Sequence, residues 1–169
     1  PHCAPELSES FHLNNTFLGG VARKAVQEGR GDFTPCYFSE GPALFREGII
    51  PVDVAFIMVS PPDKHGYVSL GVSVDYTLQA AKSAKIVVAQ VNDQMPRTLG
   101  DTFLHVSEID KFVEISAPII ELKSAELTDV ERAIGKNCAA LIPDGATLQL
   151  GIGSLPDAVL QCLYDKKDL

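Results

Sequence analysis

The sequence has 169 residues, 46% of them hydrophobic, which is enough for one complete core or for one domain and part of a second. Fourteen Lys and Arg residues are scattered among 22 Asp and Glu residues, so the formal charge of −8 argues against nucleic acids and anionic membranes as partners. No apolar run approaches the roughly 20 residues of a membrane span, and no signal peptide or lipidation motif is visible. We therefore expect a globular protein of the cytoplasm.

The first fifty residues predict two helices with a strand between them. Residues 20–28 and 41–46 read as helical, and Gly29-Arg30-Gly31 ends the first of them. The stretch from Thr34 to Phe38 favours the intervening strand.

Two continuous apolar runs follow, at residues 54–59 and 86–91. They are short and rich in β-branched residues, which is typical of strands buried on both faces. Between them Asp75 or Thr77 can cap a helix that carries Leu78, Ala81 and Ala84 on one side. A strand, a crossover helix and a second strand form one unit of a parallel sheet, so we predict an α/β layer fold.

The chain changes character after the next predicted strand, Phe112 to Ile115. Residues 116–118 contain a proline that ends this strand, and residues 121–126 form a polar connector. We place a domain boundary between residues 122 and 123.

A helix opens the second part. Thr128 and Glu131 form a capping box, and an apolar stripe recurs at helical spacing. The stripe consists of Val130, Ile134, Cys138 and Leu141.

The sharpest local motif is a strand that runs through two glycines into a second helix. In the strand, residues 146–150, Gln149 points to the same side as Gly151. Ser154 and Asp157 form a second capping box, and the helix runs to about residue 165.

The free amides of such a helix start favour a carboxylate, a phosphate or a developing oxyanion. A tight turn without a ligand uses the same glycines, and the spacing alone does not decide between the two. The motif is not a dinucleotide fingerprint, because Pro156 replaces its third glycine.

Two loops follow the buried strands, at residues 60–67 and 92–97, and both leave the carboxyl edge of the sheet. Ligands of open parallel sheets bind at that edge, so the two loops predict a cleft. Asp63 and His65 suggest acid–base chemistry, but a rigid proline-containing turn uses the same residue types, and we favour the turn. The sequence shows no recognisable pattern of a catalytic triad.

The four cysteines show no CxxC pair and no histidine at metal-ligand spacing. They lie in segments that read as apolar or helical, so we expect reduced, buried thiols and no metal site. The residues are Cys3, Cys36, Cys138 and Cys162.

Four stretches closely resemble the acetyl-CoA hydrolase/transferase family, namely VSPPDKHGYVSLGVSVDYT, KSAKIVVAQVNDQMP, GDTFLHVSEIDKFVE and IGKNCAALIPDGATLQLGIGSLPDAV. The resemblance covers most of the chain from about Asp32 onward. It implies two similar α/β domains of the CoA-transferase type, made of open parallel sheets with flanking helices, and an active site between them. Residues 1–122 would be the C-terminal part of the first domain, and residues 123–169 the beginning of the second. Because Pro1 is not a natural initiator and the chain stops where the next strand is due, we expect an internal fragment.

The resemblance also implies a chemistry. A glutamate that follows the glycine-rich turn takes up coenzyme A as a thioester in ping-pong catalysis, and its expected position lies a few residues past Leu169. Acyl-CoA and a short carboxylate of the 4-hydroxybutyrate, butyrate or acetate type are the implied substrates, without a metal, in a homodimer. The family's CoA-binding loop matches Gly151, Ile152, Gly153, Ser154 and Leu155. The active site would be lined by Gln149 and Pro156 from the second domain and by Ser60, Pro61, Asp63, Gly66, Asn92, Gln94, Met95 and Pro96 from the first.

Two other functions fit the same residues. An acyl-CoA hydrolase would share every feature named above. An effector-binding α/β domain would have the same fold but would lack the nucleophilic glutamate. The fragment by itself is expected to lack transferase activity, because it contains neither the glutamate nor the rest of the second domain.

Overall fold

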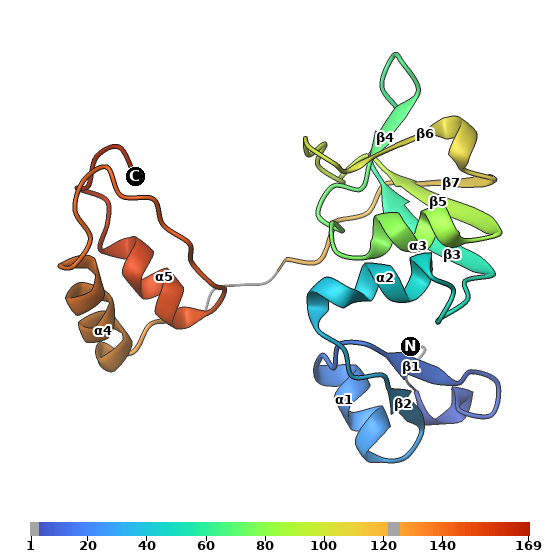
Figure 1. Ribbon diagram of the computed structural model, residues 1–169, viewed down its shortest axis with the longest axis horizontal. Coiled ribbons are helices and arrows are strands. Elements are labelled where there is room, and N and C mark those ends of the chain that lie inside the picture. The colour runs from blue at the N-terminus through green and yellow to red at the C-terminus, as the bar shows by residue number, and fades with distance from the viewer. Residues whose placement is uncertain (1–3, 122–125) are drawn as a thin grey trace. The chain divides into compact units, whose positions relative to one another are not determined.

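The computed structural model describes residues 4–121 and 126–169 (Figure 1). The chain divides into two compact units, one up to Ile119 and one from Ile120 onward. The boundary expected between residues 122 and 123 lies outside the described residues.

The first unit is built on a parallel sheet of three strands in the order β3-β5-β7. These strands are Val54–Val59, Ile86–Asn92 and Lys111–Ile115, each within one residue of its predicted bounds. Helix α3, Thr77–Ser83, connects the first two, and the Asp75 carboxylate accepts the Thr77 amide at its start (2.9 Å). The strand, crossover and strand arrangement confirms the predicted α/β class.

The core of this unit lies on one face of the sheet. Val59, Val68, Leu70 and Leu104 are almost completely buried there, and α3 adds Ala81. Helix α2, Gly41–Arg46, packs beside α3 with the Phe45 and Tyr76 rings 5.4 Å apart (Figure 1). A short antiparallel pair, β4 (Tyr67–Ser69) and β6 (Phe103–His105), and a 3-10 turn, η3 (Val106–Glu108), complete this core.

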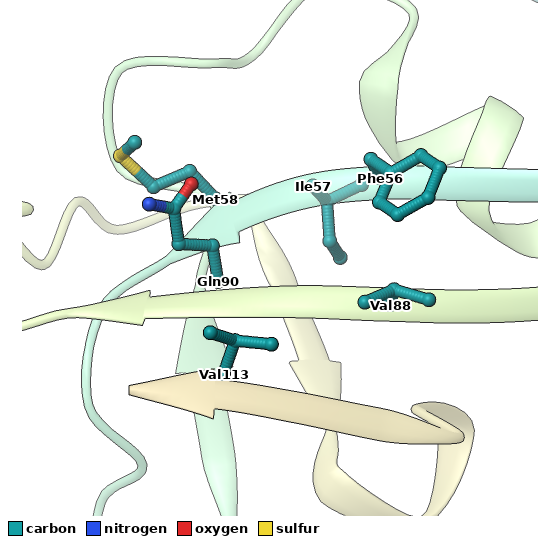
Figure 2. Close-up of a pocket in the computed structure, with 6 residues that line it drawn as sticks. All are labelled: Phe56, Ile57, Met58, Val88, Gln90 and Val113. Atoms are coloured by element: carbon teal, nitrogen blue, oxygen red, sulfur yellow. The ribbon is translucent and has the colours of Figure 1, made fainter. Parts of the chain in front are cut away.

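The described residues leave the other face of the same sheet uncovered, which contradicts the prediction that these strands are buried on both faces. The side chain of Phe56 on β3 is 81% exposed, whereas its neighbours Ala55 and Ile57 are buried. Val113 on β7 is 51% exposed on the same side (Figure 2). The reason is that the helices of this unit lie against one face only, while burial of the second face needs a second layer.

The N-terminal part folds differently from the prediction at one place. Helix α1, Gly20–Gln27, is where the sequence indicates, but the strand is β2, Gly31–Phe33, which pairs in parallel with β1, Leu13–Asn15. The predicted strand at residues 34–38 is wrong because it contains Pro35, which has no amide hydrogen for a ladder. Short 3-10 turns flank this region, η1 at Pro5–Leu7 and η2 at Phe38–Glu40.

The second unit packs two helices, α4 (Asp129–Ala139) and α5 (Ser154–Gln161), through small residues. A Cβ on Gly135 would lie 2.5 Å from the carbonyl oxygen of Ala158, so the two helices approach as closely as glycine allows. The predicted capping box of Thr128 and Glu131 is confirmed.

The apolar stripe predicted for α4 does not face this contact. Val130 and Leu141 are 69% and 84% exposed, because the helix packs through Gly135 and Ala139 on another side. Cys138 on α4 is exposed for the same reason. Cys162, which follows α5, is also exposed, Cys36 is half-buried, and Cys3 lies outside the described residues. The expectation of buried thiols is therefore wrong for two of the four cysteines.

Residues 146–150 keep the predicted alternation without forming a strand. Leu148 and Leu150 turn toward the small core of this unit, and Gln149 turns away from it. The predicted strand is wrong because the described part of this unit offers no second strand with which it could pair. Helix α5 ends at Gln161 rather than near residue 165. None of the described helices combines the length and the apolar character needed to cross a membrane.

Candidate functional site

The glycine turn before α5 stands out from the surface of the second unit. Ile152 is fully exposed, and Gly151 and Gly153 are exposed on either side of it. Gly153 precedes the first helical residue with φ 124° and ψ 177°, a conformation that residues with a side chain rarely adopt. The turn is therefore accessible, and its shape depends on glycine.

The first amides of α5 lie directly behind this glycine. The first helical hydrogen bond runs from the Asp157 amide to the Gly153 carbonyl (3.1 Å), so the amides of Ser154 and Leu155 precede the intrahelical ladder. Pro156 has no amide hydrogen. Two backbone donors and the positive end of the helix dipole are thus directed out of the turn, where they favour a negative charge.

Ser154 does not cap this helix, contrary to the prediction of a Ser154–Asp157 capping box. Within the described part of the chain no side chain caps α5, because Gly153 occupies the capping position. The Ser154 hydroxyl instead donates to the Glu131 carboxylate at the start of α4, and this bond is the largest reason why the pKa of Glu131 falls to about 2. The amide and hydroxyl of Thr128 add to the same effect. The carboxylate therefore ties the glycine turn to the α4 capping box.

This contact predicts how the stability of the second unit depends on pH. The pKa of Glu131 is lowered from 4.5 to about 2 in the folded state, so its stabilising contribution is complete above about pH 4.5 and is lost as the pH falls toward 2. We expect Glu131→Gln to lower the urea midpoint at neutral pH and to flatten its decline across this acidic window. Asp129→Asn, in the same helical turn, is the control. Equal pH profiles for wild-type protein and Glu131→Gln would contradict the assignment.

Gln149, predicted to face the active site, lies on the exposed side of the extended segment that leads to the turn. Its side-chain amide donates to the Leu150 carbonyl (3.2 Å), so it is held beside the backbone just before Gly151. It is accessible to a ligand at the turn.

A second candidate locus lies in the first unit, at the carboxyl edge of the sheet. A hollow of about 450 Å³ opens where β3, β5 and β7 all end. It is lined by Pro61, Pro62, Val91, Asp93, Glu114, Ile115 and Ser116. Of these residues only Pro61 was predicted from the sequence to line the site, although Pro62 and Asp93 lie in the two predicted loops. The third strand ends at the same edge, so the edge rule applied to Phe112–Ile115 would also have found Glu114 and Ser116.

The chemistry of this hollow is apolar at its floor and acidic at its rim. Prolines and aliphatic side chains supply most of the surface, whereas Asp93 and Glu114 each bring a carboxylate. Two carboxylates disfavour a phosphate or a free carboxylate at this rim, but they accept hydrogen bonds from amide or hydroxyl donors.

Asp63 organises the loop after β3. One carboxylate oxygen accepts the amides of His65 (2.8 Å) and Tyr67 (2.9 Å), and the other oxygen pairs with Arg97 (2.7 Å). The Tyr67 amide is the largest cause of the lowered pKa of Asp63, and the His65 amide and the Arg97 charge lower it further. An ionised carboxylate with these partners is a turn former, which agrees with the structural interpretation of Asp63 and His65 rather than the catalytic one.

Three of the predicted lining residues are buried inside the loops. Ser60 accepts the Ser69 amide (3.0 Å), and Met95 is only 4% exposed. The Asn92 amide nitrogen donates to the Ala117 carbonyl (2.8 Å), and its oxygen accepts the amides of Ala117 and Gln94. These side chains fix the shape of the loops around the hollow.

The remaining predicted residues of the first unit lie nearer the surface. Gln94 and Pro96 are exposed after β5. Gly66 has φ 82°, and a Cβ there would lie 2.8 Å from the His105 ring, so the loop needs glycine at this point. Within residues 4–121 and 126–169, no three His, Cys, Asp or Glu side chains are grouped as metal ligands.

Comparison with known proteins identifies the family. Residues 4–121 match the acetyl-CoA hydrolase/transferase N-terminal domain. The chain belongs to the acetyl-CoA hydrolase/transferase family. This confirms the resemblance read from the four sequence stretches, and it assigns the first unit to the family's N-terminal domain.

Individual members of this family are similar to the chain over nearly all of its length. The 4-hydroxybutyrate coenzyme A transferase of Clostridium kluyveri is 61% identical over 163 residues, which are 96% of this chain and 38% of that protein. The crystal structure of 4-hydroxybutyrate CoA-transferase from Porphyromonas gingivalis is 44% identical with a TM-score of 0.78, covering 96% of this chain and 43% of that one. The structure of RipA from Yersinia pestis is 35% identical with a TM-score of 0.92, covering 99% and 41%. The fold is therefore of the CoA-transferase type, and the chain spans less than half the length of these relatives.

Proposed function

We propose that the complete protein transfers coenzyme A between a short-chain acyl-CoA and a carboxylate of the 4-hydroxybutyrate, butyrate or acetate type. The observation that carries the proposal is the 61% identity, over 96% of this chain, with a protein named as a 4-hydroxybutyrate coenzyme A transferase. The exposed turn from Gly151 to Leu155 supports it, because its amides favour the negative charge that develops on an acyl oxygen. A homodimer in the cytoplasm is part of the same proposal and rests on the family resemblance.

The proposed chemistry is a two-stage exchange on a glutamate outside residues 1–169. The carboxylate attacks the thioester carbonyl, the C–S bond breaks, and an acyl-glutamyl anhydride and the CoA thiolate result. The thiolate then attacks the glutamyl carbonyl and releases the first carboxylic acid as its carboxylate, which leaves a glutamyl-CoA thioester. The acceptor carboxylate reverses these steps and departs as the new acyl-CoA, so no net proton or electron is consumed.

In this proposal the glycine turn before α5 and the carboxyl-edge hollow of the first unit have different roles. Gly151, Ile152, Gly153, Ser154 and Leu155 would contact the thioester end of CoA, with Gln149 and Pro156 beside them. The carboxyl-edge hollow of the first unit, with Pro61 and the loops that hold Ser60, Asp63, Gly66, Asn92, Gln94, Met95 and Pro96, would contribute a wall. Its acidic rim argues that this wall does not bind the phosphates of CoA.

Acceptor dependence tests the proposal. The complete protein is incubated with butyryl-CoA, with and without acetate, and both acetyl-CoA and free thiol are measured. We expect acetyl-CoA to form only with acetate, at the rate at which butyryl-CoA disappears. Thiol release that does not depend on acetate would instead favour an acyl-CoA hydrolase, a function that the family's name also includes. Binding of acyl-CoA with neither product would favour an effector-binding domain.

A further inference from the structure

Helices α4 and α5 of the second unit lie side by side (Figure 1). Gly135 on α4 packs against Ala158 on α5, where a Cβ on the glycine would lie 2.5 Å from the Ala158 carbonyl oxygen. Farther along α4, Ala139 packs with Val159 and Leu163, which lie farther along the chain after Ala158. The two helices therefore run in the same direction along their contact.

This arrangement brings the starts of the two helices together. Side chains four residues apart lie on one face of a helix, so Glu131, one turn before Gly135, lies on the contact face of α4. Ser154, one turn before Ala158, lies on the contact face of α5 in the same way. Ser154 is half-buried, whereas its two neighbours in the chain are exposed, and Glu131 is half-buried as well. The two side chains therefore turn toward each other.

The Glu131 carboxylate accepts hydrogen bonds from the starts of both helices. At the start of α4 its donors are the Thr128 amide (2.7 Å) and the Thr128 hydroxyl (2.8 Å), and at the start of α5 its donor is the Ser154 hydroxyl. The Ser154 hydroxyl, followed by the two donors of Thr128, lowers the pKa of Glu131 to about 2, so this group is ionised at neutral pH. Hydrogen bonds to a charged acceptor are stronger than those between neutral groups, so they fix Ser154 against α4.

We propose that Glu131 is a positioning residue for the glycine turn before α5 and acts through the Ser154 hydroxyl. Ser154 directly follows Gly153, and its backbone amide is one of the two donors at the start of the helix. Holding the Ser154 side chain against α4 keeps this amide and the Leu155 amide directed out of the turn. The inference rests on the proposed function, because these amides affect the rate of transfer only if negative charge develops beside them.

A double-mutant cycle tests the proposal in the complete protein. Glu131→Ala and Ser154→Ala each remove one partner of the hydrogen bond, and kcat is measured at pH 7 for acetyl-CoA formation from butyryl-CoA and acetate. We expect each variant to lower kcat about tenfold with little change in KM, because the amides are misdirected only slightly. The double variant should be no slower than either single variant, since both changes break the same bond.

Two further variants serve as controls in the same assay. Glu131→Gln keeps an acceptor oxygen at the same place, so it should recover most of the kcat that Glu131→Ala loses. Asp129→Asn removes a carboxylate from the same turn of α4, where the Asp129 side chain is fully exposed, and it should leave kcat unchanged.

Two kinetic results would overturn the proposal. A roughly 100-fold loss of kcat in the double variant, the product of two independent tenfold losses, would mean that Glu131 does not act through Ser154. An unchanged kcat in Glu131→Ala would mean that the glycine turn needs no support from α4.

Hydrogen exchange separates this inference from the proposed function. The Asp157 amide donates to the Gly153 carbonyl (3.1 Å), so it exchanges with deuterium when the start of α5 opens. We expect Glu131→Ala to speed this exchange about tenfold, and Asp129→Asn to leave it unchanged, as followed by mass spectrometry with fragmentation to single residues. Equal rates in the wild-type protein and Glu131→Ala would overturn the inference whatever the activity.

The exchange measurement also covers two other outcomes. Absence of transfer by the wild-type protein would overturn the proposed function and the catalytic role of Glu131 with it, while the exchange rates would still show whether Glu131 holds the turn. If Glu131→Ala does not fold, the exchange of Ser154→Ala, which removes only a hydroxyl, decides the question in its place.

Discussion

Replacing Gly71 with alanine is expected to destabilise the first unit by about 3 kcal/mol. Gly71 has φ 60°, and a Cβ there would overlap the buried Met95 side chain and lie 2.8 Å from the Pro96 carbonyl oxygen. The backbone of Gly71 cannot move aside easily, because two hydrogen bonds hold it in place. Its amide donates to Ser69 Oγ (3.1 Å), and its carbonyl oxygen accepts the Thr98 hydroxyl (2.8 Å). The added methyl group must therefore displace the loop after β5.

Gly48→Ala is the matched control for this prediction. Gly48 has nearly the same conformation, with φ 69°, but nothing lies within 4 Å of a Cβ placed there. The control therefore measures the left-handed backbone alone, which costs about 1 kcal/mol. Chemical denaturation of both variants gives the difference, and equal losses of unfolding free energy would show that the Met95 contact is not the cause.

The sheet of the first unit was predictable from local composition. Continuous runs of β-branched residues at 54–59 and 86–91 form strands, and the crossover between them follows from chain order. The strand expected at residues 34–38 failed on a single residue, Pro35, which outweighs its apolar neighbours.

Burial was harder to predict because it depends on elements that a strand's own sequence does not contain. The runs at β3 and β5 are apolar on both sides, yet the described helices cover only one. At residues 146–150 the side chains alternate as predicted, but a ladder needs a neighbour to supply hydrogen bonds. The stripe from Val130 to Leu141 was mistaken for the packing face of α4, because close packing at Gly135 leaves no apolar signal in the sequence.

The candidate site was predictable in its place but not in its side chains. The rule that ligands gather at the carboxyl edge located the loops after β3 and β5. It did not reveal that Ser60 and Asn92 turn inward, because the hydrogen bonds that hold them come from Ser69 and Ala117, which are distant in sequence. Such contacts are set by tertiary packing alone.

Replacing Gly153 with alanine is expected to lower kcat for CoA transfer by the complete protein about 100-fold, with a smaller change in KM. The backbone of Gly153, at φ 124° and ψ 177°, lies in a region where a side chain costs about 1–3 kcal/mol. Relief of that strain rotates the peptide that leads into α5 and redirects the amides of Ser154 and Leu155. The negative charge that develops on the acyl oxygen in the transition state would then lose hydrogen bonds from these two amides. The substrate in the ground state depends less on them, so kcat falls more than KM changes.

Gly145→Ala controls for the general effect of alanine at a glycine of the second unit. Gly145 also has a positive φ, 75°, and a Cβ there meets nothing within 4 Å, but it lies in the turn before residue 146 and outside the proposed site. We expect this variant to lose about 1 kcal/mol of stability and to keep its kcat. Initial rates of acetyl-CoA formation, measured below the melting temperature of both variants, make the comparison. A similar kcat for Gly153→Ala and Gly145→Ala would show that the glycine turn does not contribute to catalysis. Both variants carry backbone strain, but only the first redirects the amides at the start of α5.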